Sequence, residues 1–220
     1  MTIKGRTIGF ALTGSHCTVP EVLPTIERLV EAGANVIPIL SESVASSDTR
    51  FGRAQDIRER LERTTGNPVI DTIEKAEPIG PKRLIDCLVV APCTGNTLSK
   101  LALGITDSPV LMAAKAHLRN GRPVVIGIST NDGLSGSAPN LGTLLCRKNV
   151  FFIPYGQDDP WGKPTSLVAR MSEVERAVSD ALEGRQVQPI LIERWRDSTQ
   201  NKQESGGAQP INHAHTNHRS

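Results

Sequence analysis

Short apolar runs alternate with amphipathic helical patterns along the chain, and this alternation limits the possible folds more than any other feature. The runs lack the polar alternation of half-exposed strands, so they predict strands that are buried on both faces of a sheet, as parallel strands are. The expected strands are Thr7–Leu12, Val36–Leu40, Cys87–Ala91, Pro123–Ile128 and Val150–Ile153. The predicted fold class is α/β, with a doubly wound, mainly parallel sheet and helices on both faces.

Helical periodicity fills the segments between these strands. After the first strand, Thr18 and Glu21 predict a capping box at the start of an amphipathic helix. We expect one folded domain over residues 1–193 and a disordered tail over residues 194–220, which are rich in Gln, Asn, Ser and His. Further helices are expected at 51–64, 97–105, 110–119, 139–147 and 166–183.

Charge and cysteine content exclude several classes of protein. The net charge is +2, and residues 194–220 carry this whole excess with four Lys or Arg against two Asp or Glu, so the rest of the chain is not the basic surface that nucleic acid requires. The four cysteines form no C-x-x-C pair, which argues against a disulfide scaffold or a zinc site, and no metal site is expected. No apolar run approaches the roughly 18 residues of a membrane span, so we expect a cytoplasmic protein.

Two hydroxyl-rich turns follow the first and third expected strands. The first is Thr13-Gly14-Ser15-His16, and the second is Pro92-Cys93-Thr94-Gly95-Asn96-Thr97. Each leads into a helical pattern, and the first turn of a helix offers unpaired N–H groups and a partial positive charge to an anion. Taken alone, such a turn is also compatible with a plain helix cap, but two of them at one edge of a parallel sheet predict a phosphorylated cofactor. Ser41, directly after the second strand, could reach the same ligand.

The patterns that are missing narrow the choice of cofactor. The chain contains neither the G-x-G-x-x-G fingerprint of a dinucleotide site nor the P-loop pattern G-x-x-x-x-G-K-[ST]. A mononucleotide such as FMN remains, since it needs one phosphate cradle, a polar strip for the ribityl hydroxyls and backbone contacts to the ring.

The turns resemble those of the FMN-binding family of homo-oligomeric flavin-containing cysteine decarboxylases. The matching residues are Thr13-Gly14-Ser15, Ser41, the run Pro92–Ala102, Asp107 and Asn131. This resemblance covers about residues 5–193, and it implies a Rossmann-like flavoprotein fold with FMN bound between the subunits of a homo-oligomer. The implied cofactor-binding residues are Thr13, Gly14, Ser15, His16, Ser41, Pro92, Thr94, Gly95, Asn96, Thr97, Ser129, Thr130 and Asn131.

Three longer strings resemble one branch of this family, whose members form the flavoprotein component of a two-component oxidoreductase in sporulating bacteria. The strings are Thr49–Gly52, Asp107–Lys115 and Gly156–Pro160. The resemblance implies oxidation of a dihydro intermediate to a pyridine dicarboxylate, with FMN as a hydride acceptor and a nicotinamide-binding A subunit as the partner. A dicarboxylate substrate needs cationic partners, for which the candidates are Arg50, Lys163 and Arg170, and no catalytic residue is assigned.

The chain departs from the decarboxylases of this family at two places. It has no histidine between His16 and His117, where they use one, and it lacks the methionine that their pattern places shortly after Asn131. Both differences disfavour decarboxylation. Two alternatives stay open: an FMN-dependent decarboxylase of a cysteine-derived or aromatic acid, and a non-catalytic partner of the A subunit that holds no cofactor.

Overall fold

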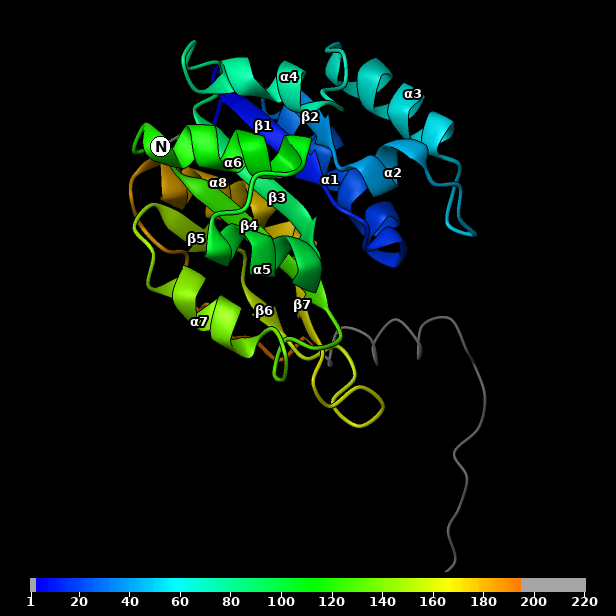
Figure 1. The fold of residues 1–220 in the computed structure, drawn as a ribbon, viewed down its shortest axis with the longest axis vertical. Helices are drawn as coiled ribbons and strands as arrows, with labels where there is room; N and C mark the ends of the chain where they lie inside the picture. The colour runs from blue at the N-terminus through cyan, green and yellow to red at the C-terminus, as the bar shows by residue number, and fades with distance from the viewer. Residues whose placement is uncertain (1–2, 195–220) are drawn as a thin grey trace, which may run out of the picture.

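The computed structural model describes residues 3–194, and five parallel strands form the centre of its sheet (Figure 1). They lie in the order β2-β1-β3-β4-β5. Every residue of β3 is buried, as expected for a strand that is covered on both faces. All five predicted strands are present close to their expected ends: β1 (Thr7–Leu12), β2 (Asn35–Leu40), β3 (Cys87–Cys93), β4 (Val124–Thr130) and β5 (Val150–Phe152).

Two short antiparallel strands extend the sheet beside the end of β4. β7 (Leu167–Ala169) pairs with the last residues of β4, where Ser129 lies opposite Val168, and β6 (Tyr155–Gly156) pairs with β7. The loop between these two strands projects from the lower edge of the molecule in Figure 1. The end of β4 is thereby joined to a segment almost forty residues further along the chain, as the register of Ser129 with Val168 shows.

The prediction of one helix over 166–183 is wrong for the first part of this segment. This part forms β7 and the 3-10 turn η3 (Met171–Glu173), and α8 (Val174–Leu182) begins only after them. Leu167 and Val168 fit the apolar pattern of the helix that follows them, but in the structure they pair with the end of β4. The sequence around them gives no sign of this distant partner.

Helices cover both faces of the sheet, which confirms the predicted α/β class with a doubly wound, mainly parallel sheet. α1 and α8 contact each other and β3 on one face, whereas α6 packs on β2, β3 and β4 on the other, towards the viewer in Figure 1. The sequence patterns miss α2 and α4 because helices this short show no periodicity. None of the helices in residues 3–194 has the length and apolar character that a membrane crossing requires. The helices besides α8 are α1 (Val19–Glu31), α2 (Glu42–Ser46), α3 (Ala54–Thr65), α4 (Ile73–Ala76), α5 (Gly95–Leu103), α6 (Pro109–Arg119) and α7 (Ala138–Leu145).

The start of α1 differs from the predicted capping box. A single 3-10 turn, η1 (His16–Thr18), precedes the helix, and Thr18 already has helical backbone angles and makes no capping bond. Its hydroxyl lies 2.9 Å from Oγ of Ser129 instead. The side chain that the sequence predicts as a helix cap therefore links the first polar turn to the end of β4.

The strand order reverses between β1 and β3. From β1 the chain moves outward to β2, and from β3 it moves outward to β4 and β5, so the connections at the carboxyl ends of β1 and β3 diverge. In open α/β sheets this divergence leaves a crevice that receives ligands. Both polar turns lie at this crevice, because Thr13 follows β1 and Thr94 follows β3.

Candidate functional site

Two hollows open where the polar turns meet. The first hollow, of about 450 Å³, is lined by Thr13, Gly14, Ser41, Glu42, Ser43, Thr94, Asn96, Thr97, Lys100, Asp107, Ser108 and Leu111. The second hollow, of about 480 Å³, is lined by Gly14, Ser15, Cys17, Thr18, Glu21, Thr94, Gly95, Ser129, Thr130, Asn131, Asp158, Lys163, Val168 and Arg194. Gly14 and Thr94 belong to both linings, so the two hollows adjoin at the turns.

Hydrogen bonds hold the two turns against each other. The Thr13 hydroxyl donates to the carbonyl oxygen of Pro92 at 2.7 Å and accepts from the backbone N–H of Thr94 at 3.1 Å. Thr94 caps α5, because its hydroxyl oxygen accepts from the backbone N–H of Thr97 at 3.2 Å. The shared rim of the hollows is thus held in shape by bonds within the protein, which lowers the cost of ordering it around a ligand.

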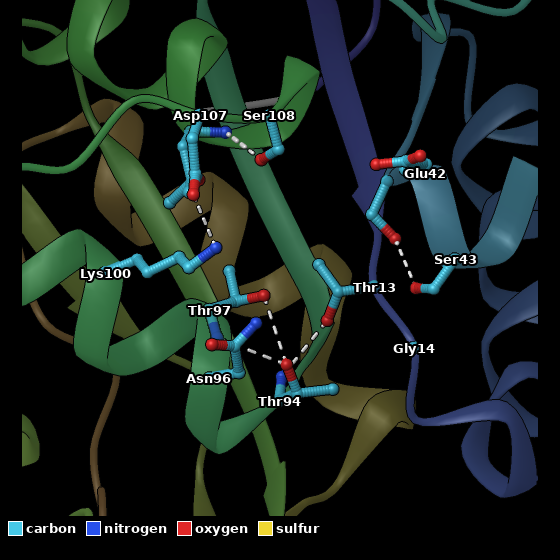
Figure 2. A pocket seen from close by; sticks show the side chains of 12 residues that line it. Thr13, Gly14, Glu42, Ser43, Thr94, Asn96, Thr97, Lys100, Asp107 and Ser108 are labelled. Atoms are coloured by element: carbon cyan, nitrogen blue, oxygen red, sulfur yellow. Dashed lines mark hydrogen bonds and ion pairs between the residues drawn. The ribbon is translucent and has the colours of Figure 1, made fainter.

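Polar and charged side chains face each other across the first hollow (Figure 2). Lys100 Nζ lies 2.6 Å from Oδ2 of Asp107, and this ion pair forms one wall together with Ser108. Glu42 and Ser43 form the opposite wall. A ligand in this hollow meets one ammonium group and several hydroxyls, which are donors that suit a phosphate or a polyhydroxyl chain. It also meets the carboxylates of Glu42 and Asp107, which accept hydrogen bonds from hydroxyls.

Gly14 lets the backbone of the first turn approach α2 closely. A methyl group at this position would lie 2.8 Å from the hydroxyl oxygen of Ser43. A side chain here would force the Ser43 hydroxyl to rotate, whereas glycine leaves the backbone open to both hollows.

Asn96 presents an amide group at the first hollow. Its side chain is exposed, and within residues 3–194 no other side chain or backbone group forms a hydrogen bond with this amide. The preceding and following residues of the turn do have such partners, since Thr94 and Thr97 bond to each other. The Asn96 amide thus has no structural partner in this part of the chain, which is the arrangement expected of a ligand-binding group.

Three hydroxyl groups cluster in the second hollow. Ser129 Oγ lies 2.8 Å from Oγ of Ser15 and 2.9 Å from Oγ1 of Thr18. Ser15 and Thr18 belong to the turn after β1, and Ser129 comes from β4, 114 positions after Ser15, so the fold brings two distant segments together. Hydroxyls can rotate to donate or to accept, so the cluster suits a ligand with either kind of polar atom.

Gly95, the first residue of α5, packs against a carboxylate that the sequence patterns do not reveal. The Asp132 carboxylate accepts hydrogen bonds from the hydroxyl of Ser137 at 3.0 Å and from the hydroxyl of Thr130. A methyl group at Gly95 would lie 2.7 Å from Asp132 Oδ1. The negative charge of Asp132 thus offsets the positive end of α5 and makes the start of this helix less favourable for an anion.

Four charged side chains form what we call the charged wall of the second hollow: Glu21, Asp158, Lys163 and Arg194. Arg194 Nη2 lies 2.9 Å from Glu21 Oε1, and Lys163 Nζ lies 3.6 Å from Asp158 Oδ2. Asp158 also accepts a hydrogen bond from the hydroxyl of Ser166. The wall contains two cations and two anions, so it suits a polar ligand rather than an apolar one.

Comparison with known proteins identifies the family to which this site belongs. The model of the flavoprotein family matches residues 1–133, which contain the whole lining of the first hollow and most of the lining of the second. The chain belongs to the flavoprotein family. The family resemblance that the two turns carry is therefore confirmed.

Two relatives in this flavoprotein family match the chain over nearly their whole length. The B subunit of dipicolinate synthase from Bacillus subtilis is 54% identical over 195 residues, which cover 89% of this chain and 98% of the relative. The crystal structure of the dipicolinate synthase B subunit from Bacillus halodurans C has a TM-score of 0.82 at 52% identity, covering 88% of this chain and 100% of that one. This similarity confirms the branch of the family that the three longer strings indicate.

A more distant flavoprotein shares the fold. The crystal structure of Burkholderia xenovorans DmrB in complex with FMN has a TM-score of 0.61 at 18% identity, covering 81% of this chain and 96% of that chain. At this identity the likeness extends to the fold alone.

The flavoprotein fold brings most of the predicted cofactor residues to the two hollows. Two are exceptions: His16 lines neither hollow, and Pro92 is buried and contributes its carbonyl oxygen to the bond with Thr13. The residues that do line a hollow are Thr13, Gly14, Ser15, Ser41, Thr94, Gly95, Asn96, Thr97, Ser129, Thr130 and Asn131.

Only one of the three predicted substrate residues reaches a hollow. Lys163 lies on the charged wall, whereas Arg50 and Arg170 line neither hollow. Arg50 lies between α2 and α3 with its guanidinium carbon 4.8 Å from the centre of the Phe51 ring, and Arg170 directly precedes η3. Both are near loops in the sequence, but the sequence does not show which way a loop folds.

Arg194, Glu21 and Asp158 are the residues of the charged wall that the sequence analysis does not predict as site residues. The sequence patterns place Glu21 in a capping box and Arg194 in the tail, whereas the two form an ion pair. Except for Arg194, the predicted tail lies outside the described residues. No signal in the sequence pairs these two residues, which are 173 positions apart.

Cys93 lies at the end of β3 beside the second turn, but it is not a reactive thiol. The residue is buried, and burial raises the pKa of its thiol above the ordinary range. The thiol stays neutral near neutral pH, and a neutral thiol is a poor nucleophile. Its role is to pack within the strand.

Proposed function

We propose that this chain binds FMN across the two hollows and acts as the flavoprotein component of dipicolinate synthase, together with the A subunit of that enzyme. The observation that carries the proposal is the meeting of two polar hollows at Gly14 and Thr94, at the crevice where the strand order reverses. The match to the B subunit of dipicolinate synthase over nearly the full length supports the choice of reaction. Its substrate would be a dihydrodipicolinate-type intermediate.

The groups at the hollows suit the parts of FMN. A phosphate would find the Ser41 and Ser43 hydroxyls, the open backbone at Gly14 and the ammonium of Lys100 in the first hollow. The Asn96 amide and the hydroxyl cluster around Ser129 would bind the ribityl chain and the polar edge of the ring. Bound FMN would supply a hydride acceptor.

The oxidation removes two hydrogens from the dihydro ring, one as a hydride and one as a proton, and leaves an aromatic pyridine dicarboxylate. In this proposal the residues of this chain bind and orient the substrate beside the cofactor. Holding the two reactants in a reactive geometry raises the rate, because the step no longer depends on a collision between free molecules in solution. No described side chain is assigned as the proton acceptor.

We also propose a homo-oligomer that completes the flavin site. The chain has seven aromatic residues (two Trp, one Tyr and four Phe), and none of those in residues 3–194 lines either hollow. One face of the ring would therefore need cover from a neighbouring copy of the chain. Leu103 and Leu145, at the ends of α5 and α7, are 72% and 43% exposed and give a surface for such contact. Sedimentation of the purified protein would test this, and a monomer at all concentrations would contradict it.

The test of the proposed function combines cofactor and product. The FMN-loaded chain, mixed with the A subunit and the dihydro intermediate, is expected to form pyridine-2,6-dicarboxylate. Chromatography of the reaction mixture measures this product. Omission of this chain should abolish formation. If a chain that retains no FMN supports the same rate, the redox role is excluded and a non-catalytic partner is the correct account. Release of carbon dioxide from a cysteine-derived or aromatic acid would favour the decarboxylase instead.

A further inference from the structure

Arg194 is the less exposed of the two cations at the second hollow. Its side chain is only 14% exposed, whereas that of Lys163 on the same charged wall is 51% exposed. A buried guanidinium loses less freedom when it binds a ligand than an exposed lysine does. It also presents a planar set of donors that matches a carboxylate.

The backbone around Arg194 explains how this residue reaches the hollow. The segment before it runs beside β6, where the Ile192 N–H donates to the Tyr155 carbonyl at 3.0 Å. Gly156 makes this path possible, because a methyl group there would overlap the carbonyl oxygen of Ile192 and approach the Arg194 nitrogen to 3.2 Å. Gly156 opens one of the strings that mark the family branch, and its place in the fold gives it a physical role: it lets the segment carrying Arg194 reach the hollow.

The partner of Arg194 is much less confined than Arg194 itself. The Glu21 side chain is 41% exposed, and it lies in the first turn of α1 at the edge of the hollow. Because the Glu21 carboxylate reaches water, it can leave the guanidinium for solvent, and a second carboxylate can take its place. The exchange keeps the guanidinium paired and moves Glu21 into water.

We propose that Arg194 is a specificity-determining residue that binds one carboxylate of the dicarboxylate substrate, in exchange for Glu21. This inference rests on the proposed function, since the substrate class comes from it. Lys163, the flexible cation of the charged wall, lies in the same hollow and is the partner for the second carboxylate. The hydroxyl cluster around Ser129 lines the same hollow.

The experiment measures binding of pyridine-2,6-dicarboxylate to the FMN-loaded chain by calorimetry, in buffer freed of divalent cations because this probe chelates them. Arg194→Gln is expected to weaken binding about tenfold or more, since it removes a charged donor from a carboxylate. Glu21→Gln is expected to leave binding unchanged or to strengthen it a few-fold, because the competing carboxylate is gone. A purely structural ion pair predicts that both variants lose affinity.

A control ion pair has its carboxylate on the same helix as Glu21. Arg60 and Glu27 form a pair of the same kind between α3 and α1, with Nη2 and Oε1 2.7 Å apart, and neither residue lines a hollow. Arg60→Gln and Glu27→Gln should therefore leave binding of the probe unchanged. Pyridine-2-carboxylate, which has one carboxylate, should bind wild type more weakly than the dicarboxylate does, and Arg194→Gln should reduce this difference.

Retained FMN separates failure of this inference from failure of the proposed function. Wild type that retains FMN, with equal affinity for the probe in wild type and Arg194→Gln, overturns the role of Arg194 and leaves the proposed function standing. Loss of affinity in Glu21→Gln to the same extent as in Arg194→Gln also overturns it. Wild type that retains no FMN contradicts the proposed function itself. If Arg194→Gln does not fold, Glu21→Gln and Arg194→Lys, which keeps the charge without the fork, decide the question.

Discussion

Thr13 connects both polar turns through one hydroxyl group, which donates to Pro92 and accepts from Thr94. Because the bond to Pro92 uses the only proton of the hydroxyl, Thr13 shapes the rim of the hollows and has no donor left for a ligand. Asn96 is the opposite case, since its amide has no partner within residues 3–194. Neighbouring polar residues of one motif thus divide between structure and ligand binding.

Asn96→Ala tests this division. We expect FMN to bind about three- to tenfold more weakly, the effect of losing one hydrogen bond, with the free energy of unfolding of the apo-protein unchanged. Calorimetric titration with FMN and urea unfolding measure the two quantities. Gln55→Ala, which removes an exposed amide from α3, is the control and should change neither. A loss of stability without a loss of affinity would show that the Asn96 amide is structural.

His117 makes stability depend on pH. The side chain is 1% exposed, its Nε2 has no hydrogen-bond partner among the described residues, and burial together with the charge of Arg122 lowers its pKa to about 4. In the unfolded chain it takes up a proton below about pH 6.5. The unfolded state therefore binds more protons between about pH 6.5 and 4, and the free energy of unfolding should fall as the pH decreases through this range.

His117→Leu removes this titration from a buried site. The free energy of unfolding of both proteins should fall between about pH 7 and pH 4. The fall should be smaller in the variant than in wild type, by up to about 3 kcal/mol. Urea unfolding at a series of pH values gives both curves, and carboxylates that titrate in the same range cancel in their difference. Parallel curves for the two proteins would show that the histidine is protonated in the folded state as readily as in the unfolded one.

The connection from β3 to α5 combines a capped helix start with a tightly packed glycine. Thr94 caps α5 by ordinary N-cap geometry, which the sequence predicts, but the packing of Asp132, Thr130 and Ser137 against Gly95 depends on the end of β4. The glycine is needed because three polar atoms that bond to one another lie where its side chain would be. The β3–α5 connection therefore depends on residues at and after the end of β4 for its conformation.

Gly95→Ala is expected to destabilise the protein by about 1–3 kcal/mol, the usual cost of overpacking, and to reduce retention of FMN. Gly142→Ala is the matched control, because Gly142 lies inside α7 and a methyl group there meets nothing within 4 Å. It should stabilise the protein by about 0.4–1 kcal/mol and leave FMN binding unchanged. Urea unfolding of both variants provides the comparison, and equal stability of the two would contradict the tight packing at Gly95.

Across the molecule, the features that depend on local sequence are those that the sequence predicts. The apolar run Cys87–Ala91 predicts β3, because a strand buried on both faces must be apolar along its length. The two turns likewise predict where a ligand site forms, because parallel strands end at one edge. β7 and Arg194 are not predictable in this way, since one is a three-residue strand paired with distant Ser129 and the other is paired with Glu21 across the fold.

The most direct measurement is titration of the purified apo-protein with FMN, followed by desalting and absorption spectroscopy. The crevice between β1 and β3, with its two adjoining polar hollows, predicts that about one FMN per chain is retained. It also predicts weaker retention in Asn96→Ala and unchanged retention in Gln55→Ala. A colourless protein after desalting, at FMN concentrations that saturate other flavoproteins, would contradict the account and leave this chain the role of a cofactor-free partner of the A subunit.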